Sequence, residues 1–155
     1  MGQNVTKWSK NVFLHTYEHS IDAKGRLIIP SKYRDDIGTQ PVVVTRGWDA
    51  NLVVYTLKAW EEYVQSWLEL PGSDPKVRKY RRYVATNAEQ CELDKQGRIL
   101  ISQELRDHAG LEKDVVISGN LTNFEIWTPE KWKEASDFGD DETIAQEIGQ
   151  LNARI

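Results

Sequence analysis

The 155-residue sequence has very little sulfur, with one cysteine and one methionine. A single cysteine excludes a disulfide within the chain and is typical of a reducing compartment such as the cytosol. We interpret Cys91 as a small buried residue rather than a reactive thiol, because no base stands near it in the sequence. No apolar run approaches the length of a membrane span, and residues 1–10 lack the apolar stretch of a signal peptide. These absences predict a cytoplasmic protein.

The sequence also lacks the patterns of common enzymes. It has no Ser-His-Asp, Cys-His or phosphate-loop pattern. The string from His15 to His19 matches the H-x-x-E-H motif, which binds zinc when it lies on a helix. Its flanks favour a strand, on which these histidines would lie about 13 Å apart, too far to share one ion. We therefore expect no metal, no cofactor, no small-molecule substrate and no enzymatic activity.

The net charge of −4 argues superficially against nucleic acid as a partner. The charges are unevenly distributed, however, since segment 134–155 holds six of the 24 acidic residues and one of the 20 basic residues. The rest of the chain therefore carries 19 bases and 18 acids. Local potential matters more than the total charge, so the basic clusters at 24–34 and 76–82 keep a nucleic-acid partner open.

An internal repeat is the clearest positive feature. Segment 21–29, I-D-A-K-G-R-L-I-I, recurs 72 residues later as segment 93–101, L-D-K-Q-G-R-I-L-I. With this offset held without a gap, 13 of the 41 residues from Ser20 to Trp60 recur in the second copy. Chance would give identity at about one position in twenty. Two copies are too few for a solenoid, so we expect a pseudo-two-fold unit in which one chain does what a homodimer would do.

Each copy predicts a strand, a tight turn and a second strand. The glycine suits a turn position with positive φ, and an acid and an arginine four residues apart can form an ion pair across the turn. The pair has two interpretations, a structural staple of the hairpin or part of a binding site. The loop position favours binding for the arginine and for Lys24. The residues concerned are Asp22, Gly25 and Arg26, and Asp94, Gly97 and Arg98.

The residues after each hairpin predict a short helix, two strands and a longer helix. In the first copy Ser31 caps a helix at 32–37 that Gly38 ends; in the second Ser102 caps a helix at 103–109 that Gly110 ends. The strands are expected at 42–45, 52–55, 115–118 and 124–127.

Longer helices are expected at 57–68, which has an apolar stripe typical of core or interface, and from Pro129, where proline opens the equivalent helix. A further helix at 75–86 links the halves, and its basic run fits either a solvated face or contact with nucleic acid. The predicted organisation is an arm at 1–12, a first domain at 13–69, a helical linker at 70–87, a second domain at 88–134 and an acidic, helical tail at 135–155.

With these residues in view, the sequence resembles the MraZ family, bacterial regulators with two SpoVT/AbrB-like domains. The resemblance runs from Phe13 to about Glu134 and rests on the two Asp-x-x-x-Arg signatures with their surroundings, K-G-R-L at 24–27, C-E-L-D-K-Q-G-R at 91–98 and L-R-D-H-A-G-L at 105–111. One departure is Ser102, which replaces the proline expected opposite Pro30.

The resemblance implies an α+β fold in which two tandem β-hairpin/α repeats form an AbrB-like, swapped-hairpin, pseudo-two-fold barrel with flanking helices. It implies a ring-shaped homo-oligomer, associated with the nucleoid, that binds double-stranded DNA at direct repeats in its own promoter. Such a protein usually represses its own division and cell-wall gene cluster. The DNA-binding residues would be Lys24, Arg26, Arg34, Lys95, Arg98 and Arg106, with Asp22, Gly25, Asp94 and Gly97 as structural members of the motif.

An alternative of another class is an AbrB-like antitoxin or scaffold that acts through protein–protein binding. The acidic tail and the Trp-rich helix at 57–68 favour it. Binding to promoter DNA that weakens steeply with salt distinguishes the first hypothesis, and capture of a protein without promoter binding distinguishes the second.

Overall fold

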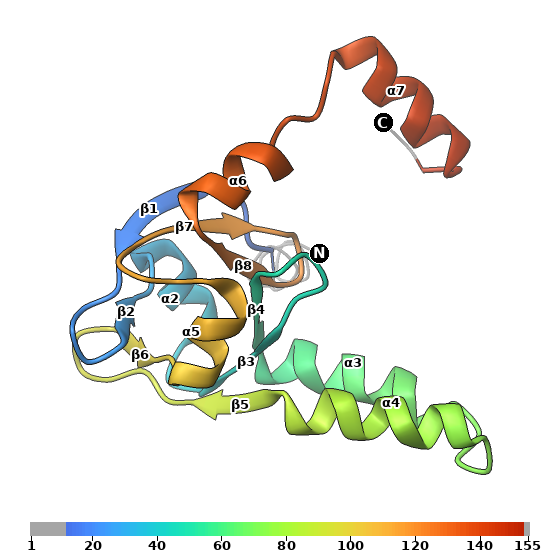
Figure 1. Ribbon diagram of the computed structural model, residues 1–155, viewed down its shortest axis with the longest axis horizontal. Helices are drawn as coiled ribbons and strands as arrows, with labels where there is room; N and C mark the ends of the chain where they lie inside the picture. The colour runs from blue at the N-terminus through green and yellow to red at the C-terminus, as the bar shows by residue number, and fades with distance from the viewer. Residues whose placement is uncertain (1–11, 154–155) are drawn as a thin grey trace, which may run out of the picture.

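The computed structural model describes residues 12–153, so the predicted arm at 1–12 lies almost wholly outside the described residues (Figure 1). The first half of the chain contains β1 (Thr16–Ser20), β2 (Arg26–Ile28), α2 (Ser31–Ile37), β3 (Val42–Arg46), β4 (Leu52–Thr56) and α3 (Leu57–Leu68). After α4 (Pro75–Thr86), the second half contains β5 (Ala88–Cys91), β6 (Arg98–Leu100), α5 (Gln103–Ala109), β7 (Asp114–Gly119), β8 (Phe124–Trp127) and α6 (Pro129–Ala135), followed by α7 (Asp141–Gln150).

The two halves exchange strands. β1 of the first half pairs with β7 of the second, and β5 of the second half pairs with β3 of the first. Together with β8 and β4 these strands form a six-stranded antiparallel sheet in the order β1-β7-β8-β4-β3-β5. The remaining strands, β2 and β6, pair with each other as a separate two-stranded ribbon. The ribbon and both edges of the sheet therefore depend on contacts between the halves.

The β2–β6 ribbon confirms the pseudo-two-fold relation. Leu27 lies opposite Ile99, and these two residues are equivalent positions of the repeat. The hydrogen bonds at the ribbon ends are reciprocal as well. Ile29 donates its backbone N–H to the carbonyl of Gly97 at 2.9 Å, and Ile101 donates to the carbonyl of Gly25 at 2.9 Å. Each turn is thus held by the strand that leaves the other turn.

The predicted AbrB-like, swapped-hairpin barrel is not confirmed, because no closed barrel is seen among residues 12–153. β1 and β5 are the two edges of the six-stranded sheet, and no pairing among residues 12–153 joins one to the other. The α+β class and the antiparallel arrangement of two repeats are confirmed. The sheet is therefore open, and the ribbon packs its inner residues into the same core.

The core receives equivalent residues from both halves. Leu27 and Ile99 of the ribbon are fully buried, and Tyr33 of α2 has its counterpart in Leu105 of α5. The ring of Phe13 packs edge-on against Tyr33 with centroids 5.1 Å apart. Because each half supplies only part of this cluster, neither half buries its apolar residues alone.

The constant 72-residue offset is wrong for one pair of strands. The residues that face the main core are Val42 and Val44 on β3 and Val115 and Ile117 on β7, which correspond at an offset of 73. The offset returns to 72 in β4 and β8, because the connection between β7 and β8 is one residue shorter than that between β3 and β4. A one-residue shift reverses the side of a strand that faces the core, so only burial identifies the true correspondence.

The short helices begin differently in the two halves. α2 begins at Ser31 after Pro30, with no side-chain cap, so the prediction that Ser31 caps this helix is wrong. The Ser102 hydroxyl accepts a hydrogen bond from Leu105 N at 3.3 Å and donates one to Glu89 Oε2 at 2.6 Å. Serine at position 102 therefore caps α5, as predicted, and ties it to β5.

The predicted helices 57–68 and 75–86 match α3 and α4, and the tail helix is observed as α7. Cys91 packs against the core, and burial, followed by the nearby Glu89 carboxylate, raises the pKa of its thiol to about 11. This value disfavours a thiolate nucleophile. None of the helices in the part of the chain that the structure describes is long and apolar enough to cross a membrane.

Candidate nucleic-acid interface

The two Asp-x-x-x-Arg segments form the same turn. Gly25 donates its backbone N–H to the Asp22 carbonyl at 3.0 Å, and Gly97 donates to the Asp94 carbonyl at 2.9 Å. The glycines have φ of +86° and +79°. A turn followed by a residue with positive φ is a common three-residue hairpin loop, and glycine adopts that conformation without a Cβ penalty. The predicted strand, turn and strand are confirmed.

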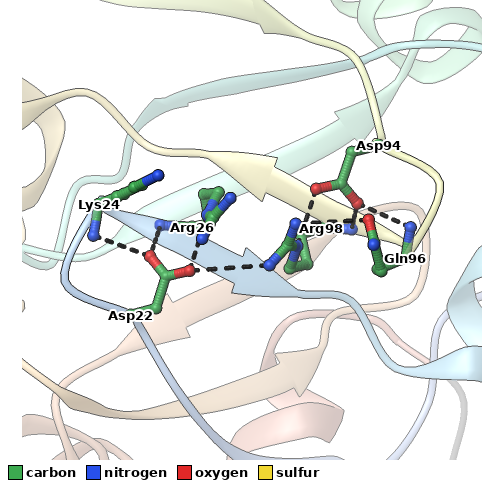
Figure 2. Close-up of polar contacts among 6 residues, drawn as sticks. All are labelled: Asp22, Lys24, Arg26, Asp94, Gln96 and Arg98. Atoms are coloured by element: carbon green, nitrogen blue, oxygen red, sulfur yellow. Dashed lines mark hydrogen bonds and ion pairs between the residues drawn. The ribbon is translucent and has the colours of Figure 1, made fainter.

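The aspartate side chain organises each turn. Asp22 Oδ1 accepts hydrogen bonds from the backbone N–H groups of Lys24 and Arg26, both at 2.9 Å. Its Oδ2 accepts one from Arg26 Nε at 2.7 Å. Asp94 Oδ1 accepts from the N–H groups of residues 96 and 98 at 2.9 Å, and its Oδ2 accepts from Nε of residue 98 at 2.8 Å. The aspartate is therefore a staple of its turn, and the same hydrogen bonds hold the arginine side chain in place (Figure 2).

These hydrogen bonds change the acidity of both aspartates. The backbone N–H of Arg26 is the largest cause that lowers the pKa of Asp22, and the guanidinium of the same residue adds to it. The N–H and guanidinium of Arg98 lower the pKa of Asp94 in the same way. Each carboxyl is thus held in its ionised form, in which it accepts hydrogen bonds most strongly.

The two arginines share one face of the ribbon. Arg26 lies opposite Leu100, and Ile28 lies opposite Arg98, so these four side chains point away from the buried Leu27 and Ile99. Ile28 and Leu100 are 39% and 59% exposed. Figure 2 shows the two guanidinium groups near each other over the paired strands. The result is a solvent-facing patch of two cations and two apolar residues.

Arg98 makes contacts beyond its own turn. Its Nη1 lies 3.9 Å from Asp22 Oδ2, which links the two turns, and its Nη2 donates to the side-chain oxygen of Gln96 at 3.3 Å. The arginine side chains are 32% exposed at position 26 and 27% exposed at position 98. Sequence reasoning missed Gln96, whose only signal was that it stands where the first copy has Lys24.

The lysines of the two turns are not equivalent. Lys24 occupies the third residue of its turn and Lys95 the second residue of the other. Both are exposed beside the arginine patch. The pseudo-two-fold relation therefore applies to the arginines and aspartates, while the two lysines stand at different positions of their turns.

Arg34 and Arg106 lie behind the turns. A Cβ placed on Gly25 would come within 2.9 Å of the Arg106 guanidinium, and one placed on Gly97 would meet Arg34 even more closely. Arg106 Nε donates to the Ile101 carbonyl at 3.0 Å. Both arginines are half-buried, and each comes from the half opposite to the turn that it supports.

The H-x-x-E-H string does not form a helical site. Residues 16–20 form β1, and His19 Nδ1 lies 2.9 Å from the Ile28 carbonyl. Within residues 12–153 there is no cluster of three or more His, Cys, Asp or Glu side chains that would hold a metal.

Two interlocked α+β repeats with paired Asp-x-x-x-Arg turns thus define the class of this chain. A family model described as "MraZ protein, putative antitoxin-like" matches it twice, at residues 12–83 and 84–146. A protein of Lachnoclostridium phytofermentans named "Transcriptional regulator MraZ" is 45% identical over 140 residues, which span 90% of this chain and 97% of that protein. One of the same name from Acetivibrio thermocellus is 43% identical over 144 residues, 93% and 99% of the two chains. The chain belongs to the MraZ family.

Proposed function

We propose that this protein is a sequence-specific, DNA-binding transcriptional regulator without catalytic activity, and that it represses its own division and cell-wall gene cluster through direct repeats in the promoter. The names of its relatives support the regulatory role. The observation that carries DNA binding is the pair Arg26 and Arg98 on the exposed face of one two-stranded ribbon. A protein that binds promoter DNA would also be located at the nucleoid.

A two-stranded ribbon fits the major groove of B-DNA, where arginine pairs bidentately with guanine. The stapling aspartates hold each guanidinium by Nε, which reduces the rotamer freedom lost on binding. Ile28 and Leu100 lie on the same face and suit contact with thymine methyl groups. The ribbon therefore combines polar and apolar readout on one surface.

The remaining basic residues of the proposed site differ in role. Lys24 and Lys95 are exposed at the turns and suit phosphate contacts, which position a protein on the duplex. Arg34 and Arg106 belong to the same set of proposed DNA-binding residues. Their positive charges lie behind the turns, and their side chains pack against the turn glycines. Their contribution includes positioning as well as charge.

We further infer that the strand exchange between halves is the swapped-hairpin arrangement of AbrB-like domains, and that the protein assembles into a ring. One ribbon offers few base contacts. Several ribbons held by one assembly bind repeated boxes through effective concentration, without new contacts. This compensates for the net charge of −4, which disfavours non-specific binding.

The experiment is a fluorescence-anisotropy titration with the duplex upstream of the protein's own gene and with a scrambled duplex of equal length. We expect preference for the native duplex and a linear fall of log affinity with log salt concentration. Lys133→Ala removes one exposed charge on α6 and serves as a control with unchanged preference. Equal affinity for both duplexes, or none, would contradict the proposal.

A further inference from the structure

A groove with a volume of about 420 Å³ lies between α3, α4 and the β3–β5 edge of the sheet. Its floor and one wall are apolar, mainly Trp60, Val64, Trp67 and Leu68 of α3. No residue of this 12-residue helix is buried, and Leu68 is 58% exposed. An amphipathic helix ordinarily buries its apolar stripe, so α3 presents a stripe that one chain leaves partly uncovered.

The opposite wall is α4, which is fixed against the end of α3. Arg81 donates from Nη2 to the carbonyls of Trp67 and Leu70, at 2.8 Å and 2.9 Å. The Trp67 carbonyl lies in the last turn of α3 and the Leu70 carbonyl just beyond it, at the helix end that carries partial negative charge. The groove is therefore formed in the single chain. Helix α4 has five basic residues and no acidic one.

Helix α7 has the complementary properties. It stands away from the rest of the molecule, at the end of the chain remote from α3 and α4 (Figure 1). Ile144, Ile148 and Leu151 follow at positions i, i+4 and i+7, and Leu151 is 77% exposed. Segment 140–150 carries four acidic residues and no base. An acidic helix with a partly exposed apolar stripe is thus joined to the body through residues 136–140.

We propose that α7 of one copy docks into the α3–α4 groove of a second copy. Anchors at i, i+4 and i+7 are the pattern with which an amphipathic helix fills an apolar groove. The acids of α7 complement the bases of α4. Because groove and helix are different patches of one chain, the contact is heterologous, and it forms a ring when the rotation between successive copies closes. This inference rests on the proposed homo-oligomer and supplies the contact between its subunits.

The test compares masses by light scattering on the full chain, whose monomer is 17.9 kDa. Ile148→Asp places a charge on the α7 stripe and Leu68→Glu places one in the groove. Neither position is buried, so both variants keep the fold, which circular dichroism checks. The matched controls, Gln146→Asp and Gln65→Glu, add the same charge at exposed positions away from the two stripes.

We expect the wild type and both controls to assemble and the two stripe variants to be monomers at the same concentration. An equimolar mixture of Ile148→Asp and Leu68→Glu has one intact groove and one intact helix, so it should give a species of about twice the monomer mass and nothing larger. Retention of the wild-type mass by both stripe variants would overturn the docking. The subunits of the homo-oligomer would then assemble through a different contact.

Two further outcomes would overturn the docking. Dissociation of the Gln146→Asp control would show that a charge away from the stripe disrupts assembly as well, so that the stripe is not the specific contact. A mixture that stays monomeric would show that helix and groove do not meet. A monomeric wild type would overturn both the docking and the proposed homo-oligomer. The duplex titration tests DNA binding separately, because none of these substitutions touches the ribbon.

Discussion

The two halves keep the same turn and differ in the helices that follow it. The Asp–Arg hydrogen bond is 2.7 Å in the first turn and 2.8 Å in the second, whereas α3 has 12 residues and α6 has seven. The turn depends on contacts within five residues and on the opposite strand, so both copies retain it. The helices pack on different surroundings, and the longer one forms a groove with α4.

A smaller difference lies behind the turns. Arg106 Nε donates to the Ile101 carbonyl, whereas Arg34 Nε is buried without a hydrogen-bond partner among residues 12–153. Arg34 also lies closer to its glycine than Arg106 does. The second turn is therefore packed more tightly from behind. The exposed face of the ribbon is therefore more alike in the two halves than the arginine side chains that pack behind its turns.

The largest expected effect comes from removing both ribbon arginines. We expect Arg26→Ala combined with Arg98→Ala to reduce affinity for the native duplex to that for a scrambled one, without unfolding. A bidentate arginine–guanine pair contributes about 1–3 kcal/mol of discrimination, so each single variant should lose about 5-fold to 150-fold in affinity for the native duplex. Anisotropy measures this. Equal losses would show two equivalent readers, and a loss confined to one arginine would break the symmetry between halves.

The next effect concerns stability and the difference behind the turns. Gly25→Ala and Gly97→Ala each place a Cβ at positive φ, which costs about 1–2 kcal/mol, and each adds a clash with an arginine. We expect Gly97→Ala to lower the free energy of unfolding in urea more than Gly25→Ala does. Gly110→Ala is the control, because its φ is +66° but its nearest neighbour would be 3.4 Å away. Equal losses of stability in all three variants would show that the clash between the added Cβ and an arginine has no effect.

The smallest effect is linked to pH. The folded-state pKa values of Asp22 and Asp94 lie below their ordinary value, so each turn adds stability that is fully present above about pH 4. That stability is lost as the pH falls through the lower folded-state values. We expect Asp22→Asn and Asp94→Asn to be slightly less stable than wild type at pH 7 and to lose less stability on acidification. Urea unfolding at several pH values measures both. Parallel curves would contradict the linkage.

Local features were predictable because their signals are local. The apolar stripe and the Asp-Pro start marked α3 and α4, whose bounds match the expectation. Glycine and the Asp–Arg spacing marked both turns. The exact correspondence of β3 and β7 was not predictable, since identities at offset 72 align Val43 with Val115 whereas burial pairs Val42 with that residue.

The sequence by itself determined the two repeats, the order of their elements and the stapled turns, because these follow from hydrogen bonds and periodicities within a few residues. Only the tertiary structure decided that β2 pairs with β6 and that each turn rests on an arginine of the other half. Such contacts join residues about 70 positions apart. They depend on which apolar faces can be buried together, and that choice is made by the whole core rather than by any one segment.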